Sequence, residues 1–100
     1  MNFSIELSEE AREDVTLAVK WYDQQKENLG DFFITHLNST LEKIRNNPAS
    51  HKKIYRQVRQ AAMQKFPYVI LYKVKGNSIT VYAVFHTKRN PKTKIRRLKK

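Results

Sequence analysis

Three side chains in the second half of the chain have the chemistry needed to act on a phosphodiester: His86, Arg89 and Arg59. Cleavage beside a 2′-hydroxyl requires a base for the hydroxyl proton, an acid for the leaving oxygen and positive charge on the phosphate. His86 is the best acid–base candidate because an imidazole titrates near neutral pH. Arg59 and Arg89 can each hold a phosphate through two N–H groups. These residues are the candidate catalytic set if the chain is a nuclease.

Further basic residues extend this set into a candidate binding surface for an anionic target. The predicted target-binding group is Lys52, Lys53, Arg56, Arg59, Lys65 and Arg89. Tyr82 is a further polar candidate, and a lysine could act as the base if neighbouring positive charge lowered its pKa. No Asp or Glu follows Glu42, so a carboxylate base would have to reach over from the first half of the chain.

Each of these side chains also has a purely structural interpretation. His86 stands at the end of an expected strand and could cap the sheet through hydrogen bonds. Arg89 could form a salt bridge with a helix carboxylate such as Glu13 or Asp14. The large aromatic residues favour core or rim positions over base stacking; they are Trp21, Tyr22, Phe66, Tyr68 and Tyr72.

Charge is distributed very unevenly along the chain. Residues 1–50 carry five basic and nine acidic side chains, a net of −4, whereas residues 51–100 carry fifteen basic side chains and no acidic one. A half-chain this basic attracts polyanions or an acidic protein partner, the alternative being a well-solvated surface. Residues 88–100 form a basic C-terminal tail that is either a short helix or mobile.

The composition excludes several classes of site. The chain has no cysteine, which rules out disulfides, Cys-based zinc sites and a cysteine nucleophile, and which fits a reducing cytoplasm. His36 and His51 show no helical metal spacing and no Gly-rich phosphate loop exists, so we expect neither a metal nor a cofactor. We expect no signal peptide, no membrane span, and one cytoplasmic domain over residues 1–100.

The first half of the sequence predicts a strand and two helices. Residues 3–7 alternate apolar and polar, which is typical of a short strand. Ser8 is an N-cap for a helix over residues 8–26, and Gly30 is suited to a left-handed position at its end. Asp31 could cap a second helix, which ends before Pro48 because the residue preceding proline resists the α conformation. The short connection predicts an antiparallel pair.

The second half predicts an antiparallel meander. A strand is expected somewhere within residues 54–65, a clear central strand over 68–75, a Gly76-Asn77 turn, and a partner strand over 78–87. In that partner strand, Ile79, Val81, Ala83 and Phe85 are expected to share one face. The sequence therefore predicts an α+β fold, with a short N-terminal strand and an antiparallel helical hairpin packed on an antiparallel sheet of about four strands.

Several short motifs follow one another along nearly the whole chain: Trp21-Tyr22, Leu29-Gly30 with Phe33, Ile44 with Pro48, the run from Lys65 to Tyr72, and His86-Thr87-Lys88-Arg89-Asn90-Pro91. Together they resemble the RelE/ParE superfamily of type II toxins, in the branch bearing F-P-Y-x-I-x-Y followed by H-x-x-R-x-P. The resemblance implies the same α+β fold. It also implies a cognate antitoxin that wraps and blocks the toxin in a hetero-oligomer.

The resemblance leaves the target open. ParE-like members poison DNA gyrase by binding, and RelE-like members cleave mRNA on the ribosome, so fold alone does not decide between them. The absence of a complete acid–base set favours the gyrase interpretation. The basic sheet favours the nuclease, whose set would be His86, Arg59, Arg89 and nearby lysines. A third interpretation is a nucleic-acid-binding module without toxicity, or an inactivated toxin.

Overall fold

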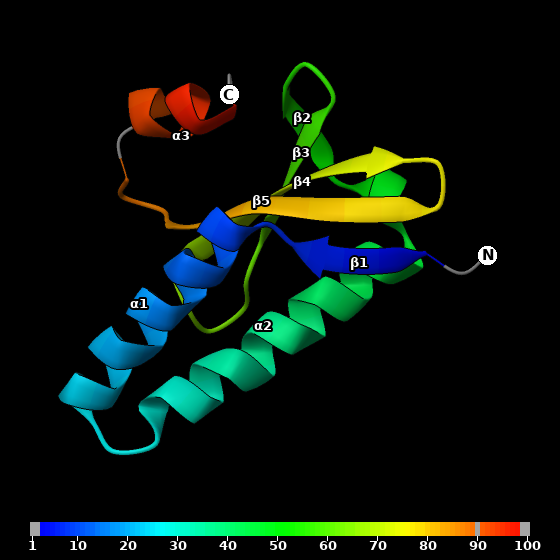
Figure 1. The fold of residues 1–100 in the computed structure, drawn as a ribbon. Coiled ribbons are helices and arrows are strands. Elements are labelled where there is room, and N and C mark those ends of the chain that lie inside the picture. Colours follow the sequence, from blue (N-terminus) through cyan, green and yellow to red (C-terminus); the bar gives the residue numbers. More distant parts are fainter. Residues whose placement is uncertain (1–2, 90, 99–100) are drawn as a thin grey trace.

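Five strands form one sheet in the order β1-β5-β4-β3-β2 (Figure 1). The computed structural model describes residues 3–89 and 91–98. Its elements are β1 (Ser4–Leu7), α1 (Glu9–Gln25), α2 (Leu29–Asn46), the short 3₁₀ helix η1 (Pro48–Ser50), β2 (Lys52–Tyr55), β3 (Val58–Ala62), β4 (Tyr68–Lys75), β5 (Ser78–His86) and α3 (Pro91–Leu98). The predicted α+β fold is confirmed.

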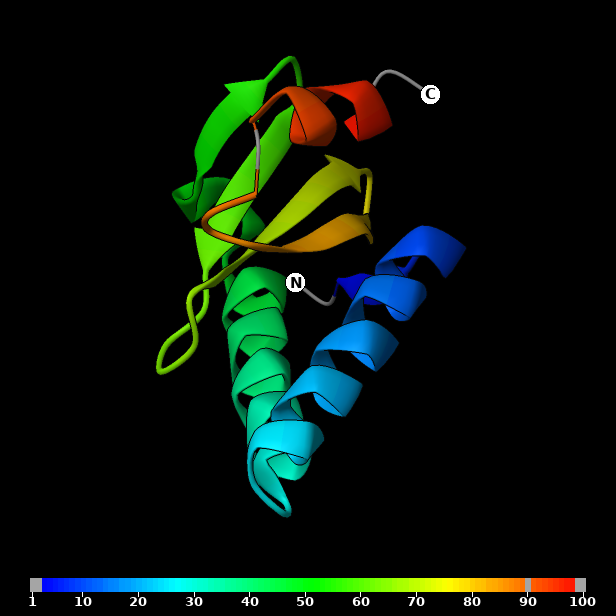
Figure 2. The same ribbon diagram turned by 90° about the vertical axis from the view of Figure 1, so that its left-hand side faces the viewer.

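The sheet differs from the prediction in its number of strands and in the direction of one of them. The sheet has five strands rather than about four, and β1 runs parallel to β5 while all other pairs are antiparallel. Figures 1 and 2 show α1 and α2 on one face of the sheet, which we call the inner face, and α3 on the opposite, outer face. The main core lies between the helical hairpin and the inner face, and a smaller cluster including Val69, Leu71 and Phe85 lies under Leu98 of α3.

Local chemistry explains the two long helices. The Ser8 side chain accepts a hydrogen bond from the Ala11 N–H and caps α1 as predicted. Gly30 is not the left-handed residue between the helices, since Asn28 takes that conformation (φ 67°) and α2 begins at Leu29. Gly30 instead lies buried inside α2, where a Cβ would come within 2.7 Å of the Val19 side chain. Its missing side chain lets the two helices approach closely.

The region expected to hold one strand contains two. Residues 52–62 form the β2–β3 hairpin, whose turn places Arg56 in the left-handed region (φ 50°). The turn has no glycine and no Asn-Gly pair, so it lacks the usual hairpin sequence signal. By contrast the β4–β5 turn occurs at Gly76-Asn77 as predicted, with Gly76 at φ 58°.

A bulge in β5 changes which side chains face the helices. Leu71 pairs with Ala83 but the next residue of β4 pairs with Val81, so Tyr82 is an extra residue in β5. The expectation that Ile79, Val81, Ala83 and Phe85 share a face is therefore wrong. Ile79 and Val81 pack in the main core on the inner face, whereas Ala83 and Phe85 belong to the outer cluster.

The basic C-terminal tail contains a helix. Within residues 88–100, α3 spans Pro91–Leu98, and the last two lysines lie outside the described residues. A helix of eight residues is not stable in water by itself, so its order depends on contacts with the sheet. Those contacts are made by Leu98, in the outer cluster, and by Arg97.

Candidate functional site

The structure brings two of the three candidate catalytic residues together and leaves the third apart. His86 and Arg89 line one groove with Tyr68. Arg59 lies opposite Tyr72 in the sheet, whereas His86 lies opposite Tyr68. Four residues separate these two positions along β4, which corresponds to about 13 Å. No single phosphate can contact Arg59 and His86 at that separation without a rearrangement of the sheet.

Arg59 is engaged in holding the chain around η1. Its Nη1 donates to the carbonyl oxygens of His51 (2.6 Å) and Ala49 (3.1 Å). Beside it, the fully buried Tyr72 hydroxyl donates to the Pro48 carbonyl (2.6 Å) and lies 3.1 Å from His51 Nδ1. Partial burial and the neighbouring Arg59 charge lower the pKa of His51. The Arg59 guanidinium therefore has a structural role. It also borders a cavity of about 310 Å³.

The groove that holds His86 and Arg89 runs between α1 and the end of β5. It has a volume of about 150 Å³ and is lined by Asp14, Leu17, Ala18, Tyr68, Val84, His86 and Arg89. His86 Nδ1 accepts a hydrogen bond from the Lys88 N–H (3.1 Å), so the ring proton of His86 is carried by Nε2. The Arg89 guanidinium lies 4.4 Å from the centre of the Phe85 ring, a cation–π contact.

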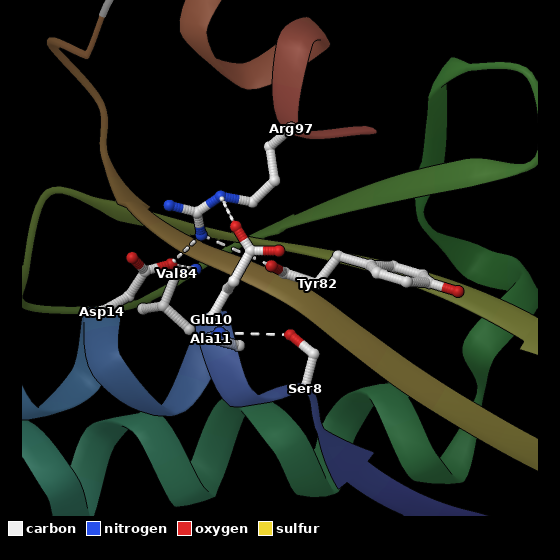
Figure 3. A network of polar contacts seen from close by, with 7 residues as sticks. All are labelled: Ser8, Glu10, Ala11, Asp14, Tyr82, Val84 and Arg97. Carbon is white, nitrogen blue, oxygen red and sulfur yellow. Dashed lines mark hydrogen bonds and ion pairs between the residues drawn. The ribbon is translucent and has the colours of Figure 1, made fainter. Parts of the chain in front are cut away.

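The expected salt bridge between Arg89 and Asp14 is replaced by one from α3. Arg97 Nη1 lies 2.6 Å from Asp14 Oδ2, and Arg97 Nε lies 3.5 Å from Glu10 Oε2 (Figure 3). The same Asp14 oxygen accepts a hydrogen bond from the Val84 N–H of β5 at 3.0 Å. Asp14 therefore ties α1 to both the sheet and α3, and its charge is neutralised within the molecule.

The other predicted target-binding residues are spread over both faces of the sheet. Lys52 pairs with Gln60 and Gln60 with Leu71, so Lys52 lies on the outer face, while Lys53 pairs with Arg59 and lies on the inner side. Arg56 stacks on the Tyr55 ring at the β2–β3 turn, and Lys65 occupies a left-handed position between β3 and β4. Two exposed residues that were not predicted, Lys73 and Lys75, add charge to the outer face.

Comparison with known proteins places the chain in a family. The model of the ParE toxin of the type II toxin–antitoxin system parDE matches residues 5–91. The chain belongs to the ParE toxin family. A chain in a solved structure of the chromosomal ParDE TA system from P. aeruginosa has the same fold, with a TM-score of 0.75 and 14% identity over 84% of this chain and 95% of that one. The search of curated proteins found no match.

The ParE family match ends at the first residue of α3, and α3 supplies Arg97, an ion-pair partner of the groove residue Asp14 that the sequence did not single out. Arg97 is one of several basic residues in the tail, and nothing in the local sequence marks it as the partner of Asp14. Leu17 and Trp21 were also missed as a surface feature. The available signal was that Leu17 and Trp21 are four residues apart on α1. They lie outside the apolar stripe that Ala11, Val15, Ala18 and Tyr22 form on the same helix.

Within residues 3–89 and 91–98, no group of three or more His, Cys, Asp or Glu side chains is arranged to hold a metal ion. None of the helices in those residues has the length and apolar character required to cross a membrane.

Proposed function

We propose that this chain is the toxin of a type II toxin–antitoxin pair, and that it stops growth by binding DNA gyrase rather than by cutting mRNA. Membership of the ParE toxin family supports the first part. The separation of Arg59 from His86 and Arg89 carries the second, because a nuclease needs its phosphate-binding and proton-transfer groups within reach of one phosphate. A cognate antitoxin would neutralise the chain by forming a hetero-oligomer with it.

Arg59, His86 and the neighbouring carboxylate of Asp14 are already engaged within the fold, which favours a function by binding over catalysis. Arg59 Nη1 already donates to two carbonyl oxygens, and His86 Nδ1 already accepts a backbone N–H. The groove carboxylate, Asp14, is occupied by Arg97 and by the Val84 N–H, so it is not available as a general base. Asp14 could therefore act as a base in this groove only after its contacts with Arg97 and the Val84 N–H were broken.

The uncovered part of the outer sheet face is the surface that we assign to the target. Lys52, Lys73 and Lys75 are exposed there, and Arg56 stands beside it at the β2–β3 turn. Clustered exposed cations speed encounter with an anionic partner and set which partner is accepted. DNA gyrase and the ribosome are both cytoplasmic, so either target places the action of this chain in the cytoplasm.

One observation supports the second candidate function, a ribosome-dependent mRNA endonuclease. His86 and Arg89 share a groove with the Tyr68 side chain. In this groove His86 could transfer a proton while Arg89 binds the phosphate. In that case the active site would consist of these groove residues together with a lysine, and Arg59 would have a structural role. A third outcome, a homologue without toxicity, would leave the basic surface as a plain nucleic-acid-binding face.

Induction of the chain in growing cells, with and without the adjacent small open reading frame, tests the proposal. We expect growth arrest, gyrase-linked DNA breaks and lost plasmid supercoiling, all relieved by the adjacent gene product. Purified chain should also inhibit gyrase supercoiling in vitro. New mRNA ends that disappear in His86→Ala and Arg89→Ala, with gyrase unaffected, would establish the nuclease instead. No growth defect at any expression level would identify a non-toxic homologue.

A further inference from the structure

We propose that the outer face of the sheet binds single-stranded nucleic acid, with one unpaired base in the hollow beneath α3 and the phosphates on the neighbouring lysines. This inference goes beyond the proposed function, because it gives the chain a binding activity of its own that requires neither gyrase nor an antitoxin. It also differs from the nuclease alternative, because the hollow shares no lining residue with the groove of His86 and Arg89.

Tyr82 is the side chain that marks this site. The chain has five tyrosines, and four of them contact another ring, a guanidinium or a hydrogen-bond partner: Tyr22, Tyr55, Tyr68 and Tyr72. Within residues 3–89 and 91–98 the side chain of Tyr82 has no such partner, although it is half-buried. Tyr82 is also the extra residue of the β5 bulge, and bulges commonly aim a side chain toward a binding site. Its ring is therefore available to stack on a base, a contact that every base can make.

The hollow beside Tyr82 has the size and the lining of a pocket for one base. It lies between α3 and the sheet, and its volume is about 240 Å³. This volume is below the range of about 300–1,000 Å³ that is usual for larger ligands. Val58 and Leu98 give the hollow an apolar wall, and Figure 3 shows the Tyr82 ring extending away from the Arg97 guanidinium. A planar base fits between an aromatic ring and an apolar wall.

The carboxylate of Glu10 determines which bases the hollow can accept. Glu10 lines the hollow, and Arg97 Nε lies 3.5 Å from its Oε2. A carboxylate accepts N–H groups, such as the exocyclic amino groups of cytosine, adenine and guanine. Its negative charge disfavours a phosphate inside the hollow itself. The hollow therefore fits a neutral base that carries an amino group, and it fits thymine or uracil less well.

The charges around the hollow favour a nucleic-acid backbone. Lys73 lines the hollow, and Lys75 lies two residues further along the same face of β4. Both are exposed, and neither forms an ion pair within the described residues. Arg56 adds a third exposed cation at the β2–β3 turn, at the same end of the sheet. The carboxylate of Glu6 also lies on this face, but on β1 beyond β5, so the phosphates are expected on the β3–β4 side.

The composition of this surface argues against an acidic protein as the ligand. Protein interfaces are depleted in lysine and are anchored by large apolar or arginine side chains. None of the large hydrophobic side chains that are exposed in the described part of the chain lies on β4 or β5. The surface instead combines lysines with the hydroxyl groups of Ser78 and Thr80, and both kinds of group bind phosphates. A duplex has no unpaired base for the hollow, so a single strand is the ligand that uses both features.

Fluorescence anisotropy of short labelled oligonucleotides with the purified full-length chain tests this inference. We expect oligo(dC) and oligo(dA) to bind more tightly than oligo(dT) and than a duplex of the same length. Tyr82→Ala should raise the Kd for oligo(dC) by roughly tenfold, whereas Tyr82→Phe keeps the ring and should bind like the wild type. Lys73→Gln should reduce the slope of log Kd against log salt concentration by about 0.7. RNA oligonucleotides of the same sequences identify whether RNA or DNA is the preferred strand.

Two matched controls remove an exposed aromatic ring and an exposed cation from α2. Phe32→Ala and Lys43→Gln should leave the Kd and the salt dependence unchanged. If Tyr82→Ala does not fold, Tyr82→Leu removes the ring while keeping most of the apolar volume, and it should show the same loss.

Three results would overturn the inference. The first is an unchanged Kd in both Tyr82→Ala and Tyr82→Leu. The second is equal binding of single strands and duplex, which would leave the hollow without a role. The third is poly-glutamate binding as tightly as oligo(dC), which would assign the face to an acidic protein. Gyrase inhibition without oligonucleotide binding would overturn this inference alone, and oligonucleotide binding without gyrase inhibition would overturn the proposed function alone.

Discussion

The contact between Asp14 and Arg97 should be the costliest ion pair in the described structure to break. The two side chains are 7% and 16% exposed, and their closest atoms are 2.6 Å apart. Replacing Asp14 by Ala removes the nearest partner of a mostly buried guanidinium and leaves the Val84 N–H without its acceptor. Removing one partner of a buried pair costs about 3–5 kcal/mol, and an unsatisfied buried N–H costs about 1–3 kcal/mol.

The full sum of these two costs is not expected, because Arg97 belongs to the short helix α3 and can turn into water once Asp14 is replaced. We therefore expect Asp14→Ala to lower the free energy of unfolding by about 3 kcal/mol. Arg97→Ala should cost less, about 2 kcal/mol, since Asp14 keeps its bond to the Val84 N–H and α3 can fray locally. The double variant should fall short of the sum by about 1 kcal/mol or more, because both changes remove the same interaction.

Urea unfolding of the wild type, the two single variants and the double variant measures these values as a double-mutant cycle. Glu42→Gln is the matched control, because it breaks the Arg45–Glu42 pair of 2.9 Å, whose side chains are 44% and 57% exposed. That exposed pair should be worth about 0.5 kcal/mol or less. Hydrogen exchange should show α3 amides losing protection in Arg97→Ala. Additive single effects, or Asp14→Ala no worse than the control, would refute the reasoning.

Three further predictions concern the supports of the fold. Tyr72→Phe should cost about 1–3 kcal/mol in urea unfolding, because it leaves the Pro48 carbonyl without its buried donor, and an unchanged midpoint would contradict this. Gly30→Ala should destabilise by about 1–3 kcal/mol although alanine is the better helix former, because the new Cβ would crowd Val19; a gain in stability would show that the helices can move apart. The lowered pKa of His51 means that the unfolded chain takes up its proton first as pH falls. Stability should therefore decline as pH drops below about 6.5, and this component of the decline should be absent in His51→Asn.

Local sequence signals predicted most of the fold because each acts within a few residues. Ser8 as an N-cap, Pro48 after α2 and Gly76-Asn77 between strands all lie where the sequence indicated. The β2–β3 hairpin was missed because Arg56, which is not glycine or asparagine, takes the left-handed conformation in its turn. The bulge at Tyr82 was missed because an extra residue in one strand is defined only by the register with its neighbour.

The candidate site was harder to predict because its contacts join distant parts of the chain. Residue types marked His86, Arg89 and Arg59 as chemically capable, but spacing along the sequence could not show that Arg59 would be held at the other end of β4. The ion pair between Asp14 and Arg97 spans 83 residues, and any of the tail cations could have been the partner. Only tertiary geometry decides such choices.

One structural feature places the groove and the ion pair at the same corner of the molecule. β1 pairs with β5 only as far as Val81, and the bulge at Tyr82 follows immediately. Beyond that point α1 replaces β1 beside β5, and Asp14 supplies the acceptor for the Val84 N–H that another strand would otherwise supply. Arg97 then closes over the same carboxylate from the outer face (Figure 3). A longer β1 would separate α1 from this stretch of β5, and the groove beside Leu17 would not form.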